Sequence, residues 1–238
     1  MTVKVAVIYY SATGDERLPA HLRGLHAITD EEKPMTVLEH EKAFREAWKD
    51  PTATRYELAP LDVNKVLADR YVLGEPLVLT RAMLWDMEAR KARHPDVFIP
   101  YVVAAGSAAA WGDEDVFVRK SMQRLWLDPQ RYGLVLEQTK LNHGSQVVTF
   151  IGAAEHPGPD GELLRATTDQ PIFHVEHSVG GTETQPLNLW RTVHLTTAPD
   201  ARLVAAFGRI DASPSLPEHI EIYVRDVLGI ALTRRDGR

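Results

Sequence analysis

The sequence predicts an α+β protein in which a curved antiparallel sheet closes around a long C-terminal helix, with an N-terminal α/β extension before the sheet. Three observations predict this class. A tryptophan-bearing helical pattern with a proline break occupies residues 79–103, a series of short alternating runs follows, and an amphipathic helical pattern starts at Ser215. A long amphipathic helix after a run of antiparallel strands needs a concave sheet to bury its apolar side.

The first of these patterns predicts a helix over residues 80–94. Thr80 is a suitable N-cap, because its hydroxyl can accept a hydrogen bond from an amide of the first turn. Apolar residues then recur at helical spacing around Leu84, and the carboxylate of Glu88 interrupts their stripe. A buried carboxylate there would have a raised pKa, whereas one at the edge of the stripe would reach solvent. The last turn carries Lys91, Arg93 and His94, whose positive charge suits the carbonyl end of a helix.

A meander is expected from about residue 70, with a first strand over residues 71–79 before that helix; Pro95 is expected to end the helix and a strand to resume at Val97. Short runs of alternating or β-prone residues continue to about residue 208, with turn residues between them. The turn Asn142–Ser145, between two alternating runs, is the clearest hairpin signal. The predicted strands lie near residues 99–105, 115–122, 132–141, 146–151, 171–179, 187–196 and 202–208.

The closing helix is predicted from a capping box, Ser215 to Glu218, with proline in its first turn. Apolar residues follow at helical spacing, and Gly229 is a suitable stop. These apolar residues are Ile220, Tyr223, Val224, Val227 and Leu228.

Residues 1–68 are predicted to form the extension and residues 69–238 the main domain. Within the extension, we expect a strand over 3–10, a helix over 37–50, a strand over 54–60 and a helix over 62–70. The loop Ser11–Gly14 after the first strand resembles the phosphate-binding loop of flavodoxin-like proteins, which hold FMN. Asp15 and Glu16 follow it directly and would repel a phosphate, so a plain strand and turn is favoured and no cofactor is predicted.

Composition excludes several classes. The 238 residues are 44% hydrophobic and carry a formal net charge of −6, which suits a folded domain and argues against a nucleic-acid partner. The sequence has no cysteine, so disulfides, thiolate catalysis and cysteine-ligated metals are excluded. No apolar run reaches the length of a membrane span, and a signal-peptide pattern is absent. We therefore expect a soluble cytoplasmic protein with no membrane partner.

One stretch resembles a known family. Leu79-Thr80-Arg81, Trp85, Lys91-Ala92, Pro95, Phe98 and Pro100 resemble the first segment of the AtaL-like branch of the START-like (SRPBCC) helix-grip superfamily. Val118-Arg119 and Val135-Leu136-Glu137 resemble its strand positions, and the likeness covers roughly residues 70–229. It implies an apolar cavity that binds lipids, polyketides or other hydrophobic molecules. Some members of the superfamily only carry the ligand, whereas others cyclise or dehydrate it.

Alternation along residues 172–179 places Phe173, Val175, His177 and Val179 on one face, which we expect to be the cavity face. His177 is therefore a candidate general acid or base, and a hydrogen-bonded core histidine is the alternative. Arg119 and Glu137 could form an inward ion pair that anchors a carbonyl or carboxylate, or a solvated pair on the outer face. We name His177, Glu137 and Arg119 as candidate catalytic residues.

The candidate ligand-binding residues are aromatic side chains that could line a pocket for a planar molecule, together with Glu88. Ordinary core packing is the alternative for each. The histidines also raise a metal hypothesis, but neighbouring strand residues point to opposite faces, so no metal is predicted. The predicted function is to bind a hydrophobic small molecule and to catalyse its cyclisation or dehydration. The alternative is a carrier that binds the molecule without catalysis. The protein is a possible homodimer. The aromatic candidates are Trp85, Tyr101, Trp190 and Tyr223, and the metal candidates are His143, His174, Glu176, His177 and His194.

Overall fold

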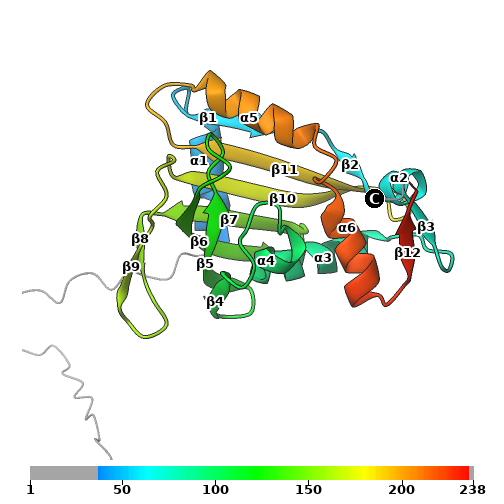
Figure 1. Ribbon diagram of the computed structural model, residues 1–238. Coiled ribbons are helices and arrows are strands. Elements are labelled where there is room, and N and C mark those ends of the chain that lie inside the picture. The colour runs from blue at the N-terminus through cyan, green and yellow to red at the C-terminus, as the bar shows by residue number, and fades with distance from the viewer. Residues whose placement is uncertain (1–36, 236–238) are drawn as a thin grey trace, which may run out of the picture. The chain divides into compact units, whose positions relative to one another are not determined.

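The computed structural model describes residues 37–235, and at its centre is a curved antiparallel sheet of eight strands (Figure 1). Seven strands follow one another in the order β1-β11-β10-β7-β6-β5-β4, and β2 also pairs with β11. Two small sheets, β3 with β12 and β8 with β9, lie outside it. The strands of the large sheet are β1 (Thr54–Glu57), β2 (Leu61–Asp62), β4 (Ala109–Gly112), β5 (Val116–Arg124), β6 (Tyr132–Asn142), β7 (Val147–Ala153), β10 (Phe173–Gly181) and β11 (Pro186–His194). The small sheets contain β3 (Tyr71–Leu73), β8 (Glu155–Pro157), β9 (Leu163–Arg165) and β12 (Leu232–Arg234).

Helices cover both faces of the large sheet (Figure 1). On the outer face, α1 packs against β6, β7 and β10. On the concave face, α3 crosses β7, β10 and β11, α5 packs against β1, and α6 packs against α4, which confirms the predicted helix-grip class. The helices are α1 (Val37–Lys49), α2 (Val63–Arg70), α3 (Arg81–Arg93), α4 (Pro95–Phe98), α5 (Ala201–Asp211) and α6 (Glu218–Ile222).

The helix predicted over 80–94 is confirmed as α3, but the strand predicted after it is wrong. Thr80 caps α3, since its Oγ1 accepts a hydrogen bond from the amide of Met83 at 3.2 Å. Pro95 then starts the short helix α4, because its fixed φ and missing N–H fit a first helical turn. Turns follow, and Val103 makes one isolated bridge with Gln123.

The central strands of the meander are confirmed, and so is the hairpin at Asn142, whose Oδ1 accepts from the amide of Ser145 at 3.1 Å. The strand predicted over 202–208 is wrong, because those residues form α5. Asp200 caps this helix, and Leu203, Ala206 and Phe207 are buried at helical spacing. Three buried residues at i, i+3 and i+4 fit a helix and not an alternating strand.

The C-terminal helix is shorter than predicted, because α6 ends at Ile222 and one π-helical turn, Tyr223–Val227, continues it. Ile220 and Val224 are completely buried, so the expected apolar face packs into the core. Gly229 ends the turn with φ of +72°, as predicted for a stop residue. The predicted capping box does not form, because the carboxylate of Glu218 binds Arg234 instead.

Part of the predicted extension belongs to the large sheet. Strands β1 and β2 both pair with β11, and α1 packs on the outer face. The strand over 3–10 and the loop Ser11–Gly14 lie outside the described residues. None of the helices in the described part of the chain has both the length and the apolar character needed to cross a bilayer.

Candidate functional site

A cavity of about 110 Å³ lies on the concave face of the sheet. Its walls come from β5, β6, β10, β11, α3, α5, the turn after α4, and Leu216. The wall is largely aromatic and aliphatic, with a few polar groups, as is typical of small-molecule sites. The aromatic members are Tyr101, Trp126, Phe173, Trp190 and Phe207, and the charged or titratable ones are Lys91, Arg119, Glu137 and His177.

Strand alternation places the inward side chains. Along β5, every second residue is buried, and these include Arg119 and Gln123. Along β10, His177 contacts Glu88 of α3, whereas Glu176 binds Arg191 on the other face. His177 therefore faces inward, as the alternation predicts.

Arg119 and Glu137 lie opposite each other in the β5–β6 register, and Arg119 Nε donates to Glu137 Oε2 at 2.7 Å. Their side chains are only 7% and 1% exposed, so the inward alternative applies and the solvated one is wrong. Each member of the pair also makes a further hydrogen bond. Arg119 donates to the carbonyl of Ala92 at 2.9 Å, and Gln123 donates to Glu137 at 3.2 Å. The Arg119 guanidinium also lies 4.0 Å from the ring centroid of Phe150.

A second buried charge cluster joins α3 to β10. Oε2 of Glu88 lies 2.9 Å from Nδ1 of His177, and its Oε1 accepts from the ammonium of Lys91. Lys91 and Glu88 are one helical turn apart, with 3% and no exposure, respectively. The Glu88 carboxylate therefore binds Nδ1 of the His177 ring, and Nε2 is the ring nitrogen that it does not contact.

The charges in this cluster determine its protonation. Burial lowers the pKa of His177 to about 4, and the Lys91 ammonium acts in the same direction, so the imidazole is neutral at pH 7. Burial alone would raise the pKa of Glu88, as expected for a buried carboxylate, but Lys91 and His177 outweigh it and hold that pKa below its usual value. Burial lowers the pKa of Lys91, against the pull of Glu88.

Two indole donors in the cavity wall are unused. Nε1 of Trp126 and Nε1 of Trp190 are buried without a hydrogen-bond partner among the residues that the structure describes. Buried N–H groups are rarely left unpaired, because the lost hydration is costly. Both rings line the cavity, and their nitrogens themselves have almost no exposed surface there.

The candidate residues do not all meet at the cavity. All three candidate catalytic residues line it, and so do Tyr101 and Trp190. Trp85 instead donates to His143 Nδ1 at 2.9 Å, and the hydroxyl of Tyr223 donates to Asp86 at 2.9 Å. Glu88 lies behind the wall, where it binds His177 and Lys91.

The metal candidates are dispersed. His174 and His177 point to opposite faces of β10, and His174 accepts from the amide of Gly152 on the neighbouring strand. His143 binds Trp85 and Asp115 in the hairpin region. Within residues 37–235, no group of three or more His, Asp or Glu side chains is placed to hold a metal ion.

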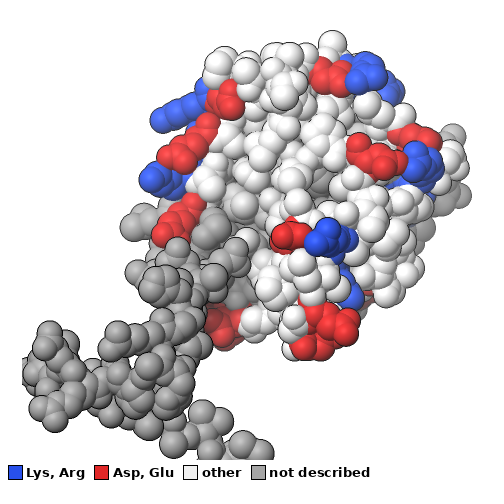
Figure 2. All heavy atoms as spheres, turned by 90° about the vertical axis from the view of Figure 1, so that its left-hand side faces the viewer, with Lys and Arg blue, Asp and Glu red and all other residues white. Residues whose placement is uncertain are grey.

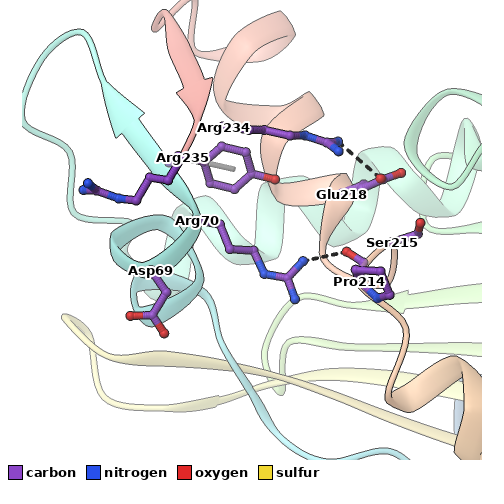
Figure 3. Close-up of a pocket in the computed structure, with 8 residues that line it drawn as sticks. Asp69, Arg70, Pro214, Ser215, Glu218, Arg234 and Arg235 are labelled. Atoms are coloured by element: carbon purple, nitrogen blue, oxygen red, sulfur yellow. Dashed lines mark hydrogen bonds and ion pairs between the residues drawn. The ribbon is translucent and has the colours of Figure 1, made fainter. Parts of the chain in front are cut away.

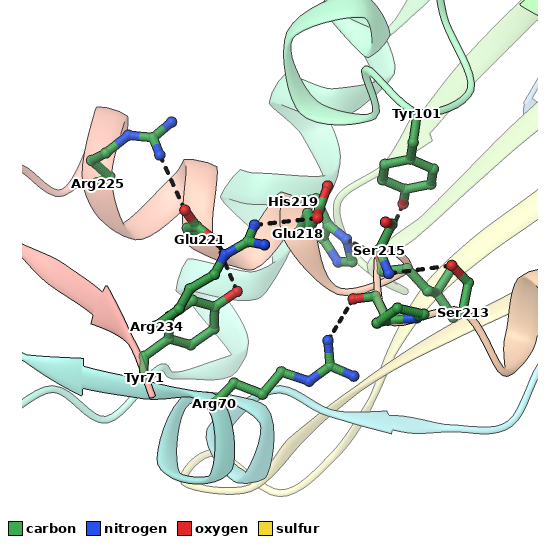
Figure 4. Close-up of polar contacts among 12 residues, drawn as sticks. Arg70, Tyr71, Tyr101, Ser213, Ser215, Glu218, His219, Glu221, Arg225 and Arg234 are labelled. Carbon is green, nitrogen blue, oxygen red and sulfur yellow. Dashed lines mark hydrogen bonds and ion pairs between the residues drawn. The ribbon is translucent and has the colours of Figure 1, made fainter. Parts of the chain in front are cut away.

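A groove of about 270 Å³ adjoins the cavity, with which it shares four wall residues, Tyr101, Val102, Trp126 and Ile210. The segment between α5 and α6 borders both spaces. The hydroxyl of Tyr101 donates to the carbonyl of Leu216 at 2.9 Å, and Arg70 donates to the carbonyl of Pro214 (Figure 4). His219, also buried, holds the same Leu216 carbonyl through its Nδ1 at 2.9 Å. These contacts fix the segment over the cavity.

Another pocket, of about 320 Å³, lies between α2, β12 and the start of α6 (Figure 3). Its arginines are used in contacts between these elements. Arg234 binds both Glu218 and Glu221, and Arg235 donates to the carbonyl of Ala68. We therefore interpret this pocket as a structural junction that anchors the C-terminal strand.

Sequence reasoning missed several members of the site, among them Trp126, Lys91 and Gln123. For Lys91 the sequence predicts only a charge that suits the carbonyl end of the helix, although its spacing of three residues from Glu88 indicates a shared face. Gln123 has no distinguishing signal of its own, and only its place two residues after Ser121 on the buried side of β5 brings it to Glu137.

Comparisons with known proteins leave the family open: no family model and no curated protein matches the chain. Solved structures with some likeness include the Zhui aromatase/cyclase from Streptomyces sp. R1128, at 10% identity and a TM-score of 0.46, over 73% of this chain and 96% of that one. Ara h 8.0201 matches at 10% identity and a TM-score of 0.44, over 73% of this chain and 99% of that one. The di-domain aromatase/cyclase StfQ from the steffimycin biosynthetic pathway matches at 11% and 0.47, over 80% of this chain and 55% of that one. Similarities of this size establish no family membership and no activity.

Proposed function

We propose that the cavity binds a small, planar, hydrophobic molecule with oxygen acceptors, and that the protein catalyses its cyclisation or dehydration in a polyketide-like pathway. The proposal rests on the excess of hydrogen-bond donors over acceptors in the cavity wall. Among residues 37–235, two indole N–H groups of the wall have no hydrogen-bond partner, Lys91 and Arg119 are cationic, and the one wall carboxylate, Glu137, is already bound by Arg119 and Gln123. Such a wall is complementary to carbonyl, enolate or phenolate oxygens.

The volume limits the ligand. A cavity of about 110 Å³ is in the range that takes a single aromatic ring, since a cavity of about 150 Å³ binds benzene. A longer substrate would need the neighbouring groove of about 270 Å³ as well. We infer that the reacting ring lies in the cavity and the remainder passes between Tyr101 and Trp126 into the groove.

His177 is the base in this proposal. Glu88 accepts from Nδ1, so a neutral His177 offers the lone pair of Nε2 to an acidic C–H or O–H of the ligand. Lys91 and Arg119 stabilise the enolate oxygen that forms when the proton leaves. In a dehydration, the departing hydroxide takes that proton and leaves as water.

The donor requirement is tested with two ring-sized probes, benzyl alcohol and toluene. In the Trp190→Phe variant the ring remains but the N–H is lost, so the affinity for benzyl alcohol should fall about fivefold while that for toluene is unchanged. Titration calorimetry or NMR line shifts give both affinities. Equal losses for the two probes would indicate a packing defect and would contradict the donor argument.

The catalytic claim is tested with a substrate identified by native mass spectrometry of protein purified from its own host. The His177→Gln variant should keep substrate affinity and lose turnover by about 100-fold or more. His143→Gln, which changes an exposed histidine outside the cavity, is the matched control. Unchanged turnover in His177→Gln would overturn the role of this residue, and loss of binding alone would favour a non-catalytic carrier.

A further inference from the structure

The amine of Lys91 is unusual for a lysine, because it is buried and belongs to a side chain that lines the cavity. Its side chain is 3% exposed, whereas that of Lys65, on α2, is 70% exposed. The nitrogen contacts Glu88 and lies 4.8 Å from the ring centroid of Trp190. A lysine loses more rotamer freedom and hydration on burial than almost any other side chain, so this placement needs a reason.

We propose that Lys91 captures a small aldehyde or ketone as an imine, which adds a covalent activity to the cavity. The nitrogen attacks the carbonyl carbon, the resulting carbinolamine loses water, and a protonated imine remains on Nζ. An ammonium and a carbonyl give an iminium and water, so no proton is gained or lost and no oxidant or reductant is required. The proposal uses the cavity of the proposed function but not its reaction.

Charge complementarity favours the product. An iminium keeps the positive charge on the same nitrogen, so Glu88 stays paired and no buried carboxylate is left alone. The attack itself needs the free amine, and the surroundings favour it. Burial and the nearby Arg119 guanidinium both lower the pKa of Lys91. Desolvation beside another cation is an established way to make a lysine nucleophilic.

A proton acceptor contacts the amine of Lys91. Glu88 bridges Lys91 and His177, so a carboxylate oxygen lies next to the nitrogen that must lose a proton before attack. Glu88 can accept this proton for a short time and return it to the departing hydroxyl, while His177, which is neutral at pH 7 because burial lowers its pKa to about 4, donates to the other carboxylate oxygen. The ring-sized cavity selects a carbonyl compound of about the size of benzaldehyde.

The test uses benzaldehyde with sodium cyanoborohydride, which reduces an imine to a stable benzyl amine. With short exposure, intact mass and peptide mapping should show one benzyl group, on Lys91, introduced at least about tenfold faster than on Lys65. Lys65→Arg should label normally, and Lys91→Arg should lose the fast label. Mapping of the wild-type protein alone also decides the matter if Lys91→Arg fails to fold, since a label confined to exposed lysines overturns the proposal.

A non-covalent probe separates this proposal from the proposed function. Benzyl alcohol has the shape of benzaldehyde but forms no imine. If benzyl alcohol binds and Lys91 is not labelled, the imine proposal is wrong and the binding function stands. If the wild-type protein neither binds benzyl alcohol nor labels at Lys91, both are contradicted.

Discussion

Arg119 and Glu137 form an ion pair that is almost completely buried beneath α3. Removing two charges from water is costly, and the pair is tolerated because Ala92 and Gln123 complete its hydrogen bonds. Breaking such a pair costs more than the pair contributes, since the remaining charge is left unmatched. The pair therefore fixes the register of β5 against β6 and holds a cation at the cavity wall.

Glu137→Gln should lower the free energy of unfolding by about 3 kcal/mol, because Arg119 remains buried without an anion. The matched control is Glu155→Gln, since Glu155 pairs with Arg165 at 3.6 Å with more than half of each side chain exposed. That change should cost less than about 1 kcal/mol. Urea titrations at pH 7 measure both free energies of unfolding. Equal losses in the two variants would mean that burial adds nothing to the cost of breaking the Arg119–Glu137 pair.

At the scale of elements, Gly152 of β7 lies directly against the backbone of Phe173 in β10. A methyl group on this residue would lie 2.3 Å from the carbonyl oxygen of Phe173, well inside van der Waals contact. Backbone cannot move aside as a flexible side chain does, so the two strands would have to separate. This contact lies at the end of the strand pair that carries His177.

Gly152→Ala should therefore destabilise the protein by about 2 kcal/mol or more and lower its thermal midpoint. Gly144→Ala in the β6–β7 turn is the control, because the nearest atom to its added methyl is Asn142 Oδ1, at 3.6 Å. Thermal unfolding followed by circular dichroism compares them. A Gly152→Ala variant as stable as Gly144→Ala would show that the strands separate readily.

For the whole molecule, the relevant feature is a set of histidines buried in the neutral state. Burial lowers the pKa of His177 and of His194 to about 4, and that of His219 to about 3. The surface in contrast carries acidic and basic side chains side by side around an uncharged area, on the face seen in Figure 2. Acid sensitivity should thus arise in the core.

Stability should fall as the pH drops from about 6.5 toward 4. In this window the unfolded chain binds protons at these histidines and the folded protein does not, so each contributes a loss of up to about 1.4 kcal/mol per pH unit. Urea midpoints at several pH values measure the slope. His219→Gln should make it shallower, and His143→Gln, on an exposed residue, should not. An unchanged slope in His219→Gln would assign the acid sensitivity to other groups.

The amino-acid sequence by itself determined the class of fold, the cap of α3 by Thr80 and the face of β10 that His177 shares with Val175. These features follow from local periodicity and capping, which neighbouring residues in the chain encode. The sequence-based prediction was wrong at α5. A run of Leu, Val, Ala and Phe suits a strand or a helix, and the packing of Phe207 on the sheet selects the helix.

Only the tertiary structure decided which charges are buried. Both faces of this sheet are covered by helices, so alternation tells which residues share a face but not which face holds the cavity. Arg119 and Lys91 would be ordinary surface charges if α3 lay elsewhere. Their burial depends on how α3 packs across the sheet, and that packing is the sum of contacts between residues far apart in the chain.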